Sequence, residues 1–126
     1  MITATGRQFS FPDCQRNRSG NANFKTQIVN YPVQSVATAE IVPLGVILLF
    51  NKLKEKGLQS VVINTVHDSV LIDTHPDEID IVKEVGPQCL LAAQDEAKKR
   101  FGLPDYIPLE VEMSYGNNWM DQKDFN

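Results

Sequence analysis

The chain has 126 residues, of which 42% are hydrophobic, and a formal net charge of −4 at pH 7. This composition favours one folded domain, or part of one, over a disordered chain. The acidic balance is atypical of a free-standing nucleic-acid-binding protein, although a local basic patch or a bridging metal ion can still bind nucleic acid.

Three further features bear on the compartment. The two cysteines, Cys14 and Cys89, lie far apart and form no CxxC pattern, which is typical of reduced thiols in a cytoplasmic protein. The first ten residues lack the apolar segment of a signal peptide. The most apolar run, residues 41–50, is half as long as the roughly 20 residues of a membrane-spanning helix. We therefore expect a soluble, cytoplasmic protein without a membrane partner.

The first half of the chain predicts a loop followed by a helix. Residues 1–30 are polar and irregular, with a turn signal at residues 19–21. A helix is predicted from Val36 to Lys56, because apolar residues surround its middle and Gly57 suits its C-terminal cap. Pro43 must lie in the first turn of this helix or kink it.

Two short β-rich runs follow, Ser60–Val66 and Ser69–Thr74, separated only by His67 and Asp68. This spacing predicts a hairpin with a two-residue connection. His-Asp is a poor pair for such a turn, since Asn-Gly fits positive φ angles better, and poor turn chemistry points towards function.

The last part predicts a helix and a strand. Apolar residues recur every three or four positions from Ile79 to Phe101, with Gly102 as the cap and Pro87 expected to kink or divide the helix. In the run IPLEVEMSYG (residues 107–116), apolar residues at every second position from Leu109 to Tyr115 alternate with polar ones, which predicts a half-buried antiparallel strand.

The predicted fold class is therefore α+β, with two main helices and an antiparallel sheet. The order loop, helix, hairpin, helix, strand matches a ferredoxin-like (split βαβ) layer from which the first strand is missing. We expect an incomplete ferredoxin-like layer.

Four segments, in order, resemble the C-terminal palm of family A DNA polymerases, the group that includes bacterial DNA polymerase I. The Gly-Arg pair and the Pro-Asp that follows it resemble the connection from the fingers to the palm, and the Asn-x-Pro-Val-Gln run resembles the start of a long palm helix. The Val-His-Asp resembles the third polymerase motif, and the final Gly-x-Asn-Trp resembles the family's closing segment. The Val-Gln-Ser and His-Asp-Ser variants look more like phage-borne members. The segments are TATGRQFSFPD (residues 3–13), NYPVQSVATAEI (30–41), VHDSV (66–70) and PLEVEMSYGNNW (108–119).

The resemblance implies a role for the hairpin turn. Polymerases of this kind use two Mg²⁺ ions, about 3.5–4 Å apart, to hold the attacking oxygen and the triphosphate. Asp68 would be one of the two catalytic metal ligands, and His67 would lie against the primer end. From the residues alone, both could instead be ordinary solvated turn residues.

The resemblance also implies contacts to the primer-template. Asn30 and Gln34 match amide residues that reach the minor groove, where acceptors occur on every base pair. Arg7 matches an arginine suited to a backbone phosphate. Gln34 could instead cap backbone amides at a helix start, and Trp119 is interpreted as a packing residue.

Several positions depart from the family pattern. Ser69 stands where a second acidic residue is usual, and Ser35 replaces a glycine. Glu40 lies one place beyond the usual aspartate, and Thr26 stands where an arginine is common. These departures put the strength of catalysis in doubt.

The chain also lacks counterparts of the motif that carries the other metal-binding aspartate, the nucleotide-binding fingers helix and the thumb. We therefore expect residues 1–34 to form the fingers-to-palm connection and residues 35–126 the palm helix, catalytic hairpin, second helix and final strand. An N-terminal polymerase portion would act in trans, with primer-template DNA and a deoxynucleoside triphosphate as further partners. The isolated chain is expected to be inactive and to self-associate through an unpaired sheet edge.

Two alternatives remain from the sequence. A palm remnant could act as a non-enzymatic module that binds DNA or a protein, and weak duplex binding without metal dependence would favour it. An HD-type phosphohydrolase is a further alternative that rests on His67-Asp68 alone. That alternative needs more histidines on helices, and only His75 remains.

Overall fold

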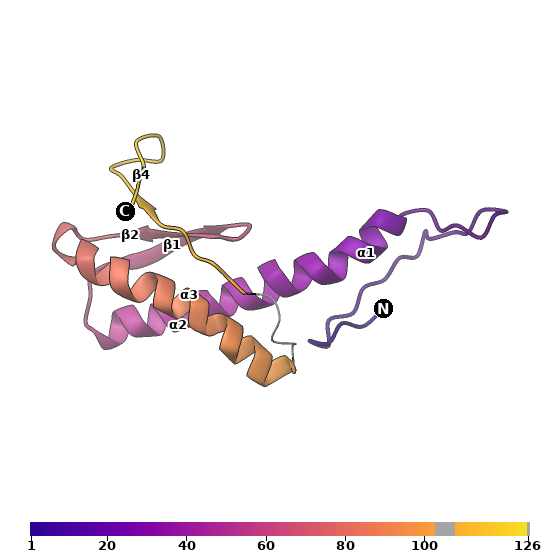
Figure 1. Ribbon diagram of the computed structural model, residues 1–126, viewed down its shortest axis with the longest axis horizontal. Helices are drawn as coiled ribbons and strands as arrows, with labels where there is room; N and C mark the ends of the chain where they lie inside the picture. The colour runs from indigo at the N-terminus through magenta and orange to yellow at the C-terminus, as the bar shows by residue number, and fades with distance from the viewer. Residues whose placement is uncertain (103–107, 126) are drawn as a thin grey trace.

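The computed structural model describes residues 1–102 and 108–125. It confirms an α+β architecture, in which two packed helices lie on one side of a two-stranded antiparallel hairpin (Figure 1). The elements in chain order are α1 (Lys25–Gln34), a π-helical segment (Ser35–Ile41), α2 (Val42–Glu55), β1 (Val61–Val66), β2 (Ser69–Asp73), a 3₁₀ turn (Pro76–Glu78), α3 (Ile79–Phe101), β3 (Ser114–Tyr115) and β4 (Lys123–Asp124).

The core lies where α2 and α3 pack along each other under the hairpin. Leu49 and Leu53 of α2 meet Val82 and Val85 of α3, and all four are buried. The two helix backbones come close at Gly45, where a Cβ atom would lie only 2.8 Å from Leu90 Cδ2. The hairpin covers this cluster with side chains of alternate strand positions, Val62, Val70 and Ile72.

The first helix begins earlier than the sequence predicted. Residues 25–55 form one helical run, so the predicted start at Val36 and the irregular character of residues 25–30 are wrong. Pro32 lies inside α1 and Pro43 at the start of α2, directly after the π-helical segment. Proline and polar residues interrupt the apolar periodicity here, so the sequence pattern does not indicate a helix. The end is as predicted, because Gly57 has φ 66° and Leu58 N–H donates to Leu53 O at 3.0 Å.

The long helical run also changes one expectation about membranes. By length and composition alone, residues 25–55 could cross a bilayer, because the run is 31 residues long and not just the apolar ten. A core helix of a soluble protein passes the same test. Leu49 and Leu53 of this run lie in the core against α3.

The predicted hairpin is confirmed. β1 and β2 pair antiparallel, with Val66 opposite Ser69 and only His67 and Asp68 between them. A β-bulge interrupts the register of β1 between Val62 and Asn64. A bulge increases local twist and makes a strand a poorer template for further pairing.

The second helix is also confirmed, with Gly102 as a left-handed cap (φ 63°). Pro87 lies inside α3 without dividing it, so the predicted division does not occur. A 3₁₀ turn precedes the helix, and Asp77 N–H donates to His75 Nδ1 at 3.3 Å.

The predicted final strand is wrong in its pairing. Residues 108–113 form no ladder in the described structure, and only Ser114 and Tyr115 pair, with Asp124 and Lys123. Burial still alternates, since Leu109, Val111 and Met113 are half-buried and the residues between them are exposed. The side chains of residues 109–113 therefore face as predicted. Met113 O accepts from Phe125 N–H at 3.1 Å, but among the described residues no strand pairs with residues 108–112. Residue 107 lies outside the described residues.

Trp119 is not packed within the described chain, contrary to the sequence interpretation. It lies between β3 and β4 and is 58% exposed. The aromatic contact at this end comes from Tyr115 and Phe125, whose ring centroids are 4.5 Å apart. Lys83 of α3 lies over the Phe125 ring at 4.7 Å, which attaches the C-terminal segment to the helix.

Candidate functional site

The turn of the β1–β2 hairpin places two polar side chains at an exposed tip. His67 has φ 56°, a left-handed conformation that few non-glycine residues adopt, although histidine is among the tolerated ones. Ser69 Oγ donates to Val66 O at 2.8 Å and closes the turn. His67 and Asp68 are both exposed. The strained backbone at this tip is of the kind that accumulates at functional sites.

Asp68 fits one ligand position of a magnesium site. Its carboxylate is exposed and takes part in no hydrogen bond or ion pair with another described residue. Magnesium is commonly held by one or two carboxylates together with substrate phosphates and water. Within residues 1–102 and 108–125, no group of three His, Cys, Asp or Glu side chains is placed to hold a metal ion. Asp68 can therefore supply one ligand, and Ser69 beside it supplies no second carboxylate.

The base of the hairpin is fixed to the start of α3 by one carboxylate. Glu78 accepts hydrogen bonds from Gln59 N–H (2.9 Å), Ser60 N–H (2.9 Å) and Ser60 Oγ (2.6 Å). Ser60 Oγ in turn accepts from His75 N–H at 3.0 Å, and Ser60 is buried. These donors, led by the Ser60 hydroxyl, lower the pKa of Glu78 below its ordinary value. The network holds the end of the hairpin opposite Asp68.

The α1 helix carries the two amide residues that the sequence singled out. Asn30 and Gln34 are both exposed and lie four positions apart, so they share one helix face. Within the part of the chain that the structure describes, the Gln34 side chain makes no capping hydrogen bond, so the alternative cap role is not realised there. In the view of Figure 1, α1 extends from the helical layer on the side to which the hairpin turn points.

Arg7 lies beside the same helical run, in an ion pair that the sequence did not predict. Arg7 Nε donates to Glu40 Oε1 at 3.0 Å, and Thr5 Oγ1 donates to the same oxygen at 3.3 Å. Phe9 and Phe11 contact the Tyr31 ring with centroid distances of 5.9 and 5.8 Å. The N-terminal segment is thus attached to α1 and the π-helical segment at several points.

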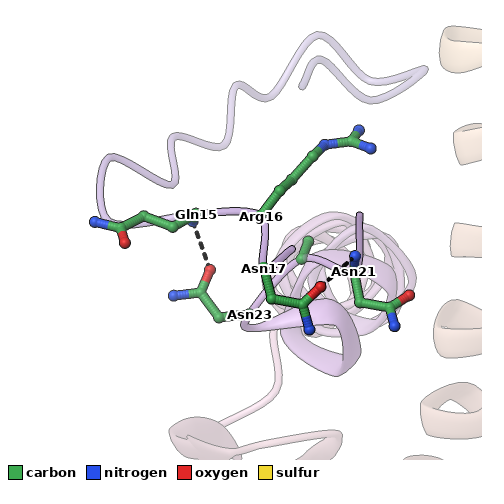
Figure 2. Close-up of a pocket in the computed structure, with 6 residues that line it drawn as sticks. Gln15, Arg16, Asn17, Asn21 and Asn23 are labelled. Carbon is green, nitrogen blue, oxygen red and sulfur yellow. Dashed lines mark hydrogen bonds between the residues drawn. The ribbon is translucent and has the colours of Figure 1, made fainter. Parts of the chain in front are cut away.

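A polar hollow of about 300 Å³ lies in the loop before α1 (Figure 2). Its amide side chains stabilise the loop itself: Asn23 Oδ1 accepts from Gln15 N–H (2.6 Å), and Asn17 Oδ1 accepts from Asn21 N–H (2.9 Å). Gly20, with φ 80°, forms the predicted turn. Since these groups are engaged in local turns, we interpret the hollow as part of the loop structure.

Comparison with known proteins decides the family. The sequence profile described as "DNA polymerase family A" matches residues 1–121, nearly the whole chain. This chain belongs to DNA polymerase family A. The resemblance read from the four sequence motifs is confirmed.

Bacterial and phage members of the polymerase family are similar to this chain along most of its length. It is 38% identical over 124 residues to DNA polymerase I of Caldicellulosiruptor bescii, with 98% of this chain and 13% of that protein covered. It is 30% identical over 121 residues to the DNA polymerase of Bacillus phage SP01, with 94% of this chain and 13% of that protein covered. DNA polymerase I of Aquifex aeolicus is 28% identical over 117 residues, with 93% and 17% covered. No solved structure gives a significant match.

This chain therefore spans 13–17% of the length of these relatives. The structure brings Arg7 to the helical run that carries Asn30 and Gln34, and it places His67 and Asp68 together on the hairpin turn. Glu40 and Glu78 were missed by sequence reasoning. The sequence held one indication for Glu40, which lies one position beyond the aspartate of the family pattern. The π-helical segment that contains Glu40 explains this offset, because a π-helical turn accommodates one additional residue.

Proposed function

We propose that this chain is the C-terminal palm portion of a DNA-directed DNA polymerase, to which it contributes Asp68 as one catalytic metal ligand. The observation that supports this most strongly is the exposed carboxylate of Asp68 at a two-residue hairpin turn. A carboxylate so placed can approach a substrate, while the two strands that carry it are held by their pairing and, at the base of the hairpin, by hydrogen bonds to Glu78. Such positioning is what nucleotidyl transfer requires of the protein.

The metal in this proposal is Mg²⁺. Asp68 would hold the ion together with ligands from outside this chain, and bound Mg²⁺ would neutralise charge that develops on the transferring phosphoryl group. His67, next to Asp68, would lie against the primer end. Neither residue is covered by another described part of the chain, so both are accessible to a substrate.

The remaining contacts in the proposal concern the primer-template. The side chains of Asn30 and Gln34 would donate to minor-groove acceptors. Because these acceptors occur on every base pair, such contacts would recognise the shape of the duplex and not its sequence. Arg7 would contact a backbone phosphate. A second polymerase portion would act in trans in the cytoplasm and cover exposed apolar side chains, among them Val33, Phe50 and Ile63. In its absence, these side chains favour self-association.

Primer extension tests the proposal. The chain would be mixed with the part of C. bescii DNA polymerase I that precedes the matching segment, and extension of a labelled primer would be followed with Mg²⁺. We expect extension only in the mixture. Asp68→Ala should abolish it, whereas Asp73→Ala, at the other end of β2, should retain it.

Two results would contradict the proposal. Extension that persists in the Asp68→Ala variant would exclude a metal-binding role for this residue. A mixture that binds duplex DNA without metal dependence and never extends the primer would favour the alternative, a palm remnant that acts as a binding module.

A further inference from the structure

Glu40 has a partly buried carboxylate that pairs with the exposed side chain of Arg7. Its side chain is 17% exposed, whereas that of Arg7 is 45% exposed. Glu40 Oε1 accepts from Arg7 Nε at 3.0 Å and from Thr5 Oγ1 at 3.3 Å. In this ion pair the accepting carboxylate of Glu40 is largely covered by the chain, whereas much of the Arg7 side chain remains exposed to solvent.

The Arg7 guanidinium keeps most of its donors free in this arrangement. Of its five N–H donors, only the one on Nε forms a hydrogen bond within residues 1–102 and 108–125. The backbone of Arg7 is fixed as well, because Arg7 N–H donates to Thr3 Oγ1 (3.1 Å) and Thr3 N–H donates to Arg7 O (2.9 Å). A side chain held at both ends loses less conformational entropy when it binds a ligand.

The π-helical segment determines where Glu40 points. Glu40 lies near its end, and the segment runs from Ser35 to Ile41. Each residue removed from a helix turns the following side chains by roughly 100° about the axis, so a regular α-helix would direct position 40 elsewhere. π-helical turns are rare and frequently lie at functional sites. The segment also leaves the buried Ser35 hydroxyl without a hydrogen-bond partner among the described residues. Such an unsatisfied group costs free energy, which other contacts of the fold must offset.

We infer that Glu40 is a positioning residue, which holds Arg7 so that its terminal amino groups bind a phosphate of the primer-template backbone. The inference rests on the proposed function, because it assumes that this surface meets DNA. The inference predicts that removal of the Glu40 carboxylate weakens DNA binding, the opposite of the usual effect of removing a negative charge. Removal of a negative charge from a DNA-binding surface should strengthen binding, whereas loss of the Arg7 position should weaken it.

The test uses a chimera in which this whole chain replaces the matching segment of C. bescii DNA polymerase I. Binding of a fluorescent primer-template duplex is measured by anisotropy over a range of KCl concentrations without Mg²⁺. Arg7→Ala should weaken binding about tenfold, as expected for the loss of one charge-assisted hydrogen bond. It should also reduce the slope of log K against log salt by about 0.9. Glu40→Ala should do the same, and the double variant should be no weaker than either.

Two further variants separate position from charge. Glu40→Gln keeps an oxygen acceptor for Arg7 Nε and should retain most of the affinity. Glu84→Gln removes a carboxylate from an exposed position on α3 and should leave binding unchanged or slightly tighter.

Three outcomes would overturn the inference. The first is tighter duplex binding by the Glu40→Ala variant than by the parent chimera. The second is that Glu40→Ala lowers the affinity by the same factor whether or not Arg7 is already replaced by alanine, which would indicate general structural damage. The third is a chimera that fails to bind the duplex at all, which would overturn the proposed function as well. A chimera that binds normally but fails to extend would count against the proposed function alone, provided that the Glu40 variants behave as expected.

Discussion

The layer formed by α2, α3 and the hairpin differs sharply from the segment before it, residues 1–34. The layer buries its own apolar side chains, and Leu49 is fully enclosed. In the first segment, no residue of α1 is buried. The chain before α1 contacts the helical run through the Phe9–Tyr31 ring contact and the Arg7–Glu40 ion pair. The comparison teaches that the layer supplies the stability and presents His67 and Asp68 on its hairpin, whereas the exposed segment carries the proposed primer-template contacts Arg7, Asn30 and Gln34.

The largest expected effect comes from the core of the layer. Leu49→Ala should lower the free energy of unfolding by about 2–5 kcal/mol, because it removes buried methyl groups and leaves a cavity. The matched variant on the exposed segment is Val33→Ala, at a side chain that is 70% exposed, and it should change stability by less than about 0.5 kcal/mol. Urea denaturation followed by circular dichroism measures both. Equal losses would show that the first segment is packed as tightly as the layer.

A smaller loss is expected at the junction between the hairpin and α3. Ser60→Ala removes a buried hydroxyl that donates to Glu78 and accepts from His75 N–H. An unsatisfied buried group of this kind costs about 1–3 kcal/mol. Thermal unfolding should reveal the loss, and unchanged stability would mean that water replaces the hydroxyl at this junction.

The same junction predicts a dependence on pH. The hydroxyl of Ser60, followed by the N–H of Gln59, lowers the pKa of Glu78 below its ordinary value of 4.5. A lowered folded-state pKa means that this carboxylate stabilises the fold above pH 4.5, and that the contribution is lost as pH falls through the folded-state pKa. The stability difference between the unsubstituted chain and Ser60→Ala should therefore narrow below pH 4.5. A difference that stays constant from pH 7 to pH 3 would contradict this assignment.

The smallest expected change in stability is a gain at the hairpin turn. His67→Gly relieves the left-handed backbone at φ 56° and should stabilise the chain by up to about 1 kcal/mol, after the greater entropy of glycine in the unfolded state is subtracted. Primer extension by the mixture should fall, because the imidazole is lost. A variant that is less stable than the parent would indicate that the imidazole supports the turn through contacts of its own.

The layer could be predicted from sequence because its signals are local. The two-residue gap between Ser60–Val66 and Ser69–Thr74 allows only a tight hairpin, and apolar periodicity after Ile79 defines α3. The glycines at positions 57 and 102 mark both helix ends. The residues of the proposed metal site followed from the family motif, and the structure adds the exposed, left-handed turn that presents them.

The exposed segment resisted prediction because its structure depends on distant partners. Helix α1 contains Pro32 and has no buried residue, so it lacks the apolar pattern of a packed helix. The Arg7–Glu40 pair joins residues far apart in sequence, which no local pattern reveals. The final strand failed for a related reason: residues 109–113 alternate correctly, but strand formation also needs a neighbour to accept its hydrogen bonds.

The most direct test of the central claim, that Asp68 binds a catalytic metal ion, is a metal-specificity switch. Asp68→Cys replaces an oxygen ligand with a softer thiolate, which binds Mg²⁺ poorly and binds Mn²⁺, the softer of these two ions, better. In the primer-extension mixture, we expect this variant to be inactive with Mg²⁺ and to regain activity with Mn²⁺, while the parent chain works with both. Full activity of Asp68→Cys with Mg²⁺, or no recovery with Mn²⁺, would contradict direct metal ligation by Asp68.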